Sequence, residues 1–123
     1  MDITERVEVE QALRENDEKL RSLFDLSPLG ISLNDMSGQF IEANPAITEI
    51  TGYSLEEIQK LSYWDLTPAQ YADKEAQQLE LLNSIGRYGP YEKEYIHKQG
   101  HPAPVELNGM LITGRDGQHY IWS

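Results

Sequence analysis

Residues 40–58, FIEANPAITEITGYSLEEI, carry the densest set of local structural signals in the chain. The pair at 44–45 predicts a helix start, since Asn can accept hydrogen bonds from free helical amides and Pro suits the first helical position. Gly52 is placed to end that helix. Ser54 and Glu57 have the spacing of a capping box, which predicts a second short helix directly afterwards. This stretch therefore predicts a strand followed by two consecutive short helices.

The segments on either side complete the expected fold. Residues 31–33 and 40–43 alternate apolar and polar side chains around a turn at 35–38, which predicts a hairpin. A longer helix is expected after Pro68, ending at Gly86. Its expected apolar stripe consists of Ala72, Ala76, Leu79 and Leu82.

The hydrophobic period changes from helical to alternating after Gly89 and Pro90. Residues 91–98, 105–113 and 119–123 are predicted strands, with a possible bulge at Gly109. The order of elements predicts an α+β fold, in which helices cover one face of a five-stranded antiparallel sheet.

The first 26 residues contain no Gly or Pro and predict an amphipathic helix. Apolar residues recur at alternating spacings of four and three, with one Asn on the same seam, as in a coiled coil. Two interpretations stay open: the helix packs on its own domain, or it pairs with a second copy. The polar insert favours pairing, because a seam Asn can fix register. The expected dimer seam is Val9, Leu13, Asn16, Leu20 and Leu23.

Composition limits the possible functions. The chain has 123 residues, 39% of them hydrophobic, which suits one domain with a modest core. Its 21 acidic and 10 basic residues give a formal charge of −11, which argues against binding to nucleic acid or anionic lipid. No apolar run is long enough for membrane insertion. The absence of Cys excludes thiolate metal sites and covalent flavin–cysteine adducts.

No residue pattern identifies a catalytic or metal site. His97, His101 and His119 could meet, but histidines beside turns are usually surface residues, and we expect no metal. Glu92 and Glu94 share a strand face that we expect to be solvated. We therefore expect no catalytic residues.

Residues 20–123 resemble a PAS sensor domain. The resemblance rests on residues 20–31 (LRSLFDLSPLGI), 40–46 (FIEANPA) and 50–58 (ITGYSLEEI), in this order and at these spacings. Two departures from the family pattern, at 69–70 and 98–100, do not affect the expected fold. Residues 2–4, Asp-Ile-Thr, resemble the motif with which an upstream PAS domain ends. We therefore expect a connector helix at 1–19, cut from a tandem array, and a PAS domain at 20–123 whose last strand is truncated.

The resemblance implies a sensory or signal-relay module of a larger protein, such as a histidine kinase or diguanylate cyclase. It implies a non-catalytic fragment with further PAS and output domains in cis. The expected location is the cytoplasm, either free or as the cytoplasmic part of a membrane-anchored sensor. Two alternatives are a ligand-free dimerisation adaptor and a small cone-shaped enzyme of isomerase type. The enzyme would need a buried catalytic acid, for which Asp65 is the candidate.

In a PAS domain, a ligand would lie between the sheet and the helices. The haem-binding members use a His in the long helix, and residues 68–85 contain none. No cofactor is expected, although a noncovalent flavin or a small organic acid stays open. The same aromatic residues could simply fill the core. The candidate pocket walls are Tyr53, Trp64, Tyr71, Leu82, Tyr95 and Leu107.

Overall fold

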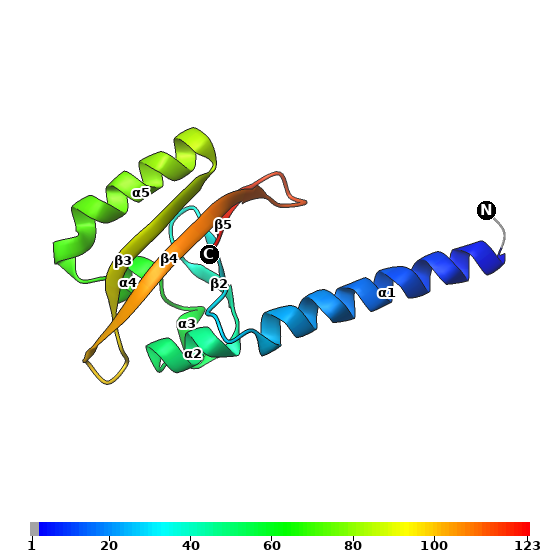
Figure 1. Ribbon diagram of the computed structural model, residues 1–123, viewed down its shortest axis with the longest axis horizontal. Coiled ribbons are helices and arrows are strands. Elements are labelled where there is room, and N and C mark those ends of the chain that lie inside the picture. Colours follow the sequence, from blue (N-terminus) through cyan, green and yellow to red (C-terminus); the bar gives the residue numbers. More distant parts are fainter. Residues whose placement is uncertain (1–2) are drawn as a thin grey trace.

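The computed structural model describes residues 3–123. Of the predicted motif at 2–4, Asp2 lies outside the described residues, and Ile3 and Thr4 lie in the first helix. Five helices, one 3₁₀ turn and five strands follow one another along this range (Figure 1). In chain order they are α1 Ile3–Leu26, β1 Ser32–Asp35, β2 Phe40–Ala43, α2 Pro45–Thr51, α3 Leu55–Ile58, α4 Tyr63–Leu66, η1 Ala69–Tyr71, α5 Ala72–Ile85, β3 Arg87–Ile96, β4 Pro102–Thr113 and β5 His119–Trp122.

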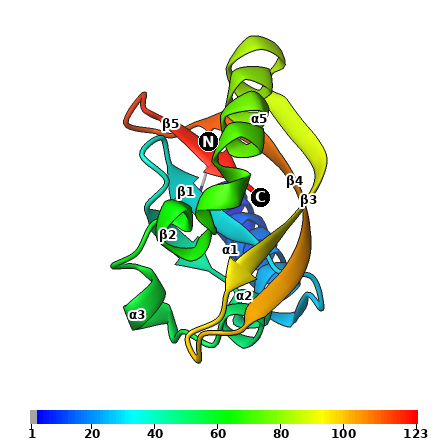
Figure 2. The same cartoon turned by 90° about the vertical axis from the view of Figure 1, so that its left-hand side faces the viewer.

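The strands form one antiparallel sheet in the order β2-β1-β5-β4-β3. The last strand therefore lies at the centre, between the first strand and the long β3–β4 hairpin. Figure 2 shows α5 beside β3 and β4 of the sheet. The predicted α+β architecture is confirmed.

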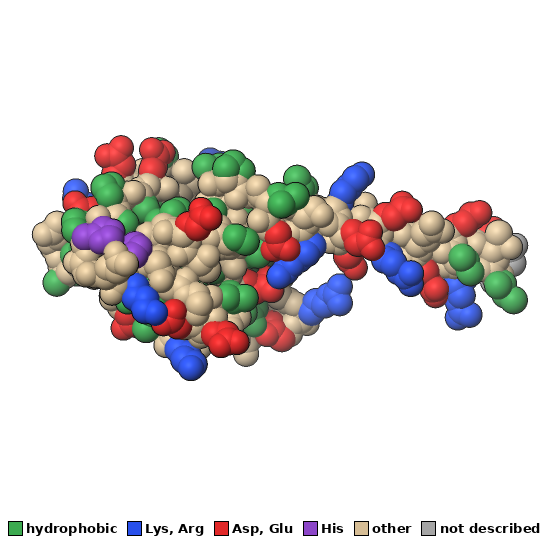
Figure 3. Space-filling view, turned by 90° about the horizontal axis from the view of Figure 1, so that it is seen from below, with side chains coloured by type: hydrophobic (Ala, Val, Ile, Leu, Met, Phe, Trp, Pro, Cys, Tyr) green, Lys and Arg blue, Asp and Glu red, His purple; other side chains and the backbone are tan. Residues whose placement is uncertain are grey.

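Helix α1 extends away from the rest of the domain (Figure 1). Only Phe24 is buried, and its ring stacks on Trp122 of β5 at 5.9 Å between centroids. Charged side chains cover much of the helix in Figure 3. The apolar seam residues are 47–67% exposed. The interpretation in which this stripe packs on its own domain is therefore wrong.

Asn44 joins four segments of the chain at the base of α1. Its side chain is completely buried. The Oδ1 atom accepts from the amides of Ile47 (3.2 Å), as a helix cap, and of Ile31 (2.9 Å). The Nδ2 atom donates to the carbonyls of Phe24 (3.0 Å) and Leu29 (2.9 Å). The sequence predicted the cap, and the structure adds the link between α1, β1 and α2.

The predicted helix boundaries after residue 52 need three corrections. The helix predicted after Ser54 would carry Leu55, Ile58 and Leu61. Helix α3 has the predicted capping box but ends at Ile58, before Leu61. A short helix, α4, was not predicted; Ser62 and Asp65 form its capping box. The long helix begins at Ala72, because a 3₁₀ turn occupies the residues after Pro68.

The buried face of α5 differs from the predicted stripe. Ala72 and Ala76 are exposed, whereas Glu75 and Leu82 are buried. Burying the small side chains of Ala72 and Ala76 would remove little apolar area from water, so they do not decide which face of α5 points inward. The contact with β3 decides it. As a result, α5 points a carboxylate into the interior.

The β3–β4 hairpin is longer than predicted and its bulge lies elsewhere. Strand β3 begins before the Gly89-Pro90 pair, and β4 begins at Pro102. Tyr88 pairs with Gly109 and Tyr91 with Leu107, so the extra residue is on β3 rather than at Gly109.

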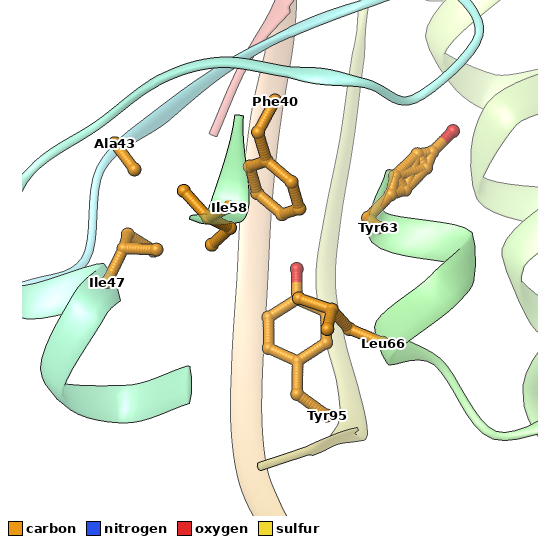
Figure 4. Packing of buried hydrophobic residues seen from close by; sticks show 7 residues of the cluster. All are labelled: Phe40, Ala43, Ile47, Ile58, Tyr63, Leu66 and Tyr95. Carbon is orange, nitrogen blue, oxygen red and sulfur yellow. The ribbon is translucent and has the colours of Figure 1, made fainter. Parts of the chain in front are cut away.

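The core lies between α2, α3, α4 and the inner face of the sheet. Figure 4 shows Phe40, Ile58 and Tyr95 converging from β2, α3 and β3. Phe40, Ile58 and Leu66 are at most 2% exposed. The residues of this cluster are Phe40, Ala43, Ile47, Ile58, Tyr63, Leu66 and Tyr95.

Candidate functional site

A buried ion pair lies between the sheet and the long helix. The Lys93 ammonium, on β3, contacts the Glu75 carboxylate, on α5. The two side chains are only 1% and 7% exposed. Lys93 Nζ also donates to Thr67 Oγ1 at 3.0 Å. Buried charges are costly unless they are paired. Here the carboxylate pairs with the ammonium, and the Thr67 hydroxyl accepts a further hydrogen bond from the ammonium.

Three tyrosine rings surround the Lys93 ammonium. The distances from Nζ to the ring centroids are 4.8 Å for Tyr95, 5.5 Å for Tyr63 and 5.7 Å for Tyr91. Aromatic faces attract cations most strongly where water is excluded. The amine therefore occupies an aromatic box closed by a carboxylate.

Burial changes the protonation of this cluster. It lowers the pKa of Lys93 to about 7, because the ammonium loses its hydration. Burial also raises the pKa of Tyr63 to about 12 and raises that of Tyr95. The tyrosine hydroxyls thus stay protonated at neutral pH.

A small cavity adjoins the ion pair. Its volume of about 30 Å³ is enough for one or two water molecules. The Tyr63 hydroxyl, which lines it, is buried and has no hydrogen-bond partner within residues 3–123. The lining residues are Ser32, Asn34, Tyr63, Glu75, Gln78, Leu79, Tyr88, Lys93, Tyr95, Leu107, Ile121 and Ser123.

The predicted wall residues are dispersed in the structure. Tyr95 and Leu107 line the cavity. Tyr53 packs at the edge of the core, and Leu82 is fully buried on the inner face of α5. Trp64 is 40% exposed, while Tyr71 lines an open surface hollow beside Lys93. The structure thus brings two of the six predicted residues to the cavity.

Comparisons with known proteins agree with this architecture. The family model described as a PAS domain matches residues 28–122. The chain belongs to the PAS domain family.

Relatives of this PAS domain are signalling proteins. The chain is 32% identical over 98 residues to the hybrid signal transduction protein dokA of Dictyostelium discoideum, covering 78% of the chain and 6% of that protein. It is 31% identical over 107 residues to the probable diguanylate cyclase DgcE of Escherichia coli, covering 85% and 10%. It is 33% identical over 105 residues to the sensor histidine kinase TmoS of Ectopseudomonas mendocina, covering 85% and 11%. The chain therefore spans only a small part of the length of these relatives.

Solved structures of sensory box and PAS domains share this fold. A domain of a sensory box sensor histidine kinase/response regulator from Geobacter sulfurreducens superposes with a TM-score of 0.69 and 25% identity, covering 89% of this chain and 94% of that one. The PAS domain of an HTR-like protein from Haloarcula marismortui has a TM-score of 0.75 at 23% identity, covering 94% of each chain. The domain is thus homologous to sensor domains of histidine kinases and diguanylate cyclases, and its role is that of a signal-sensing module.

Glu75 and Lys93 were missed as interior residues by sequence reasoning. Lys93 alternates with Tyr91 and Tyr95, so the strand period alone places all three on one face. The structure shows that this face points inward. A second available signal was the spacing of Glu75, four residues before Leu79 on α5, which places both on one side of the helix.

A second ion pair fastens the β3–β4 turn to the helices. Lys98 Nζ contacts Glu57 Oε2 at 2.6 Å on the surface, and the Lys98 amide donates to the Thr51 carbonyl at 2.9 Å. The same Glu57 side chain completes the α3 capping box with Ser54. The hydrogen bond from Lys98 and those from Ser54 lower the pKa of Glu57 to about 2.

The three histidines and Asp65, which the sequence analysis also considered, do not line the cavity beside Lys93. The rings of His97 and His101 stack at 4.3 Å, whereas His119 contacts Thr113 at 3.2 Å. The histidines in Figure 3 lie at the end of the molecule opposite α1. Asp65 Oδ2 accepts from the Ser62 amide at 2.8 Å and is exposed, so it caps α4 and does not line the cavity.

Residues 3–123 hold neither a metal-ligand cluster nor a membrane-spanning helix. They contain no group of three or more acidic, His or Cys side chains arranged to hold a metal ion. No helix in the same range is long and apolar enough to span a membrane. Glu92 is exposed and Glu94 is half-buried on the outer face of β3.

Proposed function

We propose that this PAS domain relays signals in a larger histidine kinase or diguanylate cyclase, and that it does so as a homodimer joined through α1. The exposed seam of α1 is the observation that supports this proposal. Most helical stability in proteins comes from packing of an apolar face, and this face of α1 is exposed in the structure. A parallel second copy would bury the seam of both helices at once.

The residues of the seam would specify the register of the dimer as well as bury apolar surface. Leu13, Leu20 and Leu23 supply apolar contact, and Val9 extends the stripe toward the N-terminus. Asn16 stands in the middle of it. A polar seam residue lowers stability but penalises shifted registers, because a shift would leave the amide facing apolar side chains. Such a dimer could transmit a change at the root of α1 along the helix pair.

We further propose that the domain works without flavin or haem. Small-molecule pockets usually measure about 300–1,000 Å³, whereas the cavity beside Lys93 has about 30 Å³. The chain has no Cys, and α5 has no His. A larger ligand would have to separate the Lys93–Glu75 pair. The small cavity favours a second candidate function, a ligand-free dimerisation adaptor.

A matched pair of substitutions tests the dimer. Leu13→Lys places a charge on the seam, and Val7→Lys places the same charge on an exposed apolar residue outside it. Light scattering should give a dimer for the unaltered chain and for Val7→Lys, and a monomer for Leu13→Lys. A dimer that survives Leu13→Lys would show that the interface lies elsewhere.

The ligand question needs a different measurement. Native mass spectrometry of freshly purified protein reports retained small molecules together with the oligomeric state. A copurified flavin or haem would contradict the ligand-free proposal while leaving the dimer proposal intact.

We place the domain in the cytoplasm, beside further PAS and output domains of the same polypeptide. The relatives support this placement, since each is much longer than the chain and two are named as a kinase and a cyclase.

A further inference from the structure

Lys93 borders both an internal cavity and the surface of the domain. It lines the small cavity of about 30 Å³, and it also lines an open surface hollow of about 590 Å³. A small molecule in the hollow would therefore reach the cavity by displacing one side chain. The other residues that line the hollow are Tyr71, Lys74, Glu92, Glu94, Pro104, Val105 and Glu106.

The cavity has the polarity of a binding site rather than of a packing defect. Empty cavities in proteins are apolar, whereas this one is bordered by an amine, a carboxylate and several hydroxyl and amide groups. Tyr63 is 8% exposed, and its hydroxyl has no hydrogen-bond partner within residues 3–123. A buried donor without a partner is costly, so the cavity has a place for a polar atom beside Tyr63.

The Lys93 ammonium can pass a proton to a group that it already contacts. Transfer to the Glu75 carboxylate converts two buried charges into an uncharged amine and an uncharged acid. Burial penalises the charged forms, and it lowers the pKa of Lys93 to about 7. The other titratable groups that face Nζ within the described range are Tyr63, Tyr91 and Tyr95, which are uncharged at neutral pH. An uncharged lysine amine in such a pocket is a nucleophile.

We propose that Lys93 is a covalent binding site for a small uncharged aldehyde, which it holds as a protonated imine. The amine nitrogen forms a bond to the carbonyl carbon. The carbonyl oxygen takes two protons that were on the nitrogen and leaves as water. An ammonium and an aldehyde thus give a protonated imine and water, so atoms and charge balance without an oxidant or a reductant.

The buried charges stay paired in this product. The protonated imine has the same single positive charge as the ammonium, so it keeps its attraction to Glu75 and to the tyrosine rings. Glu75 would carry protons from the nitrogen to the departing oxygen. Tyr63 would donate a hydrogen bond to the carbonyl oxygen, because burial raises its pKa to about 12 and keeps the hydroxyl protonated.

The size and charge of the cavity limit the aldehyde. A space for one or two water molecules accommodates about two or three non-hydrogen atoms. A carboxylate on the ligand would lie in the same cavity as Glu75, where the two negative charges repel each other. The site therefore fits a two-carbon aldehyde and excludes keto acids and aromatic aldehydes. This inference goes beyond the proposed dimer and does not depend on it.

Reductive labelling of the unaltered chain tests the inference. Acetaldehyde is added at pH 7 with cyanoborohydride, which reduces an imine to a stable ethylamine, and peptide mass spectrometry measures the ethylation rate of each lysine. Lys93 should react at least about tenfold faster than the exposed Lys60 and Lys98, because ordinary lysines are almost entirely protonated at this pH. A lysine that is merely buried should react most slowly of all.

Two tyrosine variants form a matched pair. The Tyr63 and Tyr91 rings lie 5.5 and 5.7 Å from Lys93 Nζ, and Tyr63 lines the cavity whereas Tyr91 is not among its lining residues. Tyr63→Phe should slow the ethylation of Lys93 by about fivefold, the effect of one ordinary hydrogen bond, and Tyr91→Phe should leave it unchanged. Benzaldehyde should label the exposed lysines but not Lys93.

The pH dependence separates reaction in the folded domain from reaction in unfolded molecules. The uncharged fraction of an ordinary lysine rises about tenfold per pH unit between pH 7 and 9, whereas an amine that is half uncharged at pH 7 gains at most about twofold. The ratio of Lys93 to Lys98 ethylation should therefore fall steeply as the pH rises. A constant ratio, slower reaction of Lys93 than of Lys98 at pH 7, or an unchanged rate in Tyr63→Phe would overturn the inference and leave the dimer proposal intact.

Discussion

Replacement of Lys93 by Met is the sharpest test of the interior of this PAS domain. The variant keeps a long flexible side chain in the tyrosine box but removes the only charge that contacts the buried Glu75 carboxylate among the described residues. Removing one partner of a buried ion pair typically costs about 3–5 kcal/mol, because the other charge stays behind unpaired. The stability of a small domain is about 5–15 kcal/mol in total. Lys93→Met should therefore remove a large fraction of the stability of the domain.

The double variant Lys93→Met with Glu75→Leu should recover this loss. Replacing both members of a buried pair by apolar residues is often neutral, or stabilising by about 1–4 kcal/mol. The free energy of unfolding, measured by urea titration with circular dichroism, should thus be lowest for the single variant. The double-mutant cycle gives the coupling energy directly.

Lys98→Met is the matched control, since Lys98 also pairs with a glutamate but lies at the surface. Exposed ion pairs contribute little, so its urea midpoint should change only slightly. A Lys93→Met variant as stable as Lys98→Met would refute the argument, as would a double variant less stable than Lys93→Met alone.

Three further predictions concern the local anchors. Asn44→Ala should lower the free energy of unfolding by about 3 kcal/mol, because it removes a helix cap and leaves two carbonyls and an amide without their hydrogen-bond partner. Urea titration measures this loss, and a value below about 1 kcal/mol would contradict the prediction. Gly52→Ala should destabilise the domain by about 1–2 kcal/mol or more, since φ is +77° at residue 52 and the His97 ring occupies the space that the Ala Cβ would need. An unchanged melting temperature would disprove this. The pKa of Glu57 is about 2 in the folded state against an ordinary value of 4.5, so its contribution is present above pH 4.5 and is lost as the pH falls toward 2. Glu57→Gln should flatten the dependence of the urea midpoint on pH within this window, and a parallel pH profile would exclude this role.

The helix starts and turns could be predicted because their causes are local. Asn44, Gly52 and the Ser54–Glu57 pair act on backbone groups within four residues of themselves. Helix α4 depends on an equally local capping box, with Asp65 in place of Glu, but this signal was overlooked. Strand alternation placed Tyr91 and Tyr95 on one face in the same way.

The seam of α1 lies between these cases. Its heptad spacing follows from the sequence alone, and the sequence left open whether the stripe would face its own domain. Only the tertiary structure decided this, because the hydrogen bonds of Asn44 and the stacking of Phe24 on Trp122 direct α1 away from the sheet.

The amino-acid sequence by itself determined the family, the order of elements and the caps, whereas the tertiary structure decided what lies inside. Glu75 and Lys93 are 18 positions apart, on a helix and a strand whose relative rotation no local pattern specifies. Sequence reasoning favours alanines over a glutamate for a buried helix face, since an unpaired charge is costly to bury. The structure reverses that choice because the partner charge, the Thr67 hydroxyl and three tyrosine rings meet at one point, and this convergence exists only once the chain has folded.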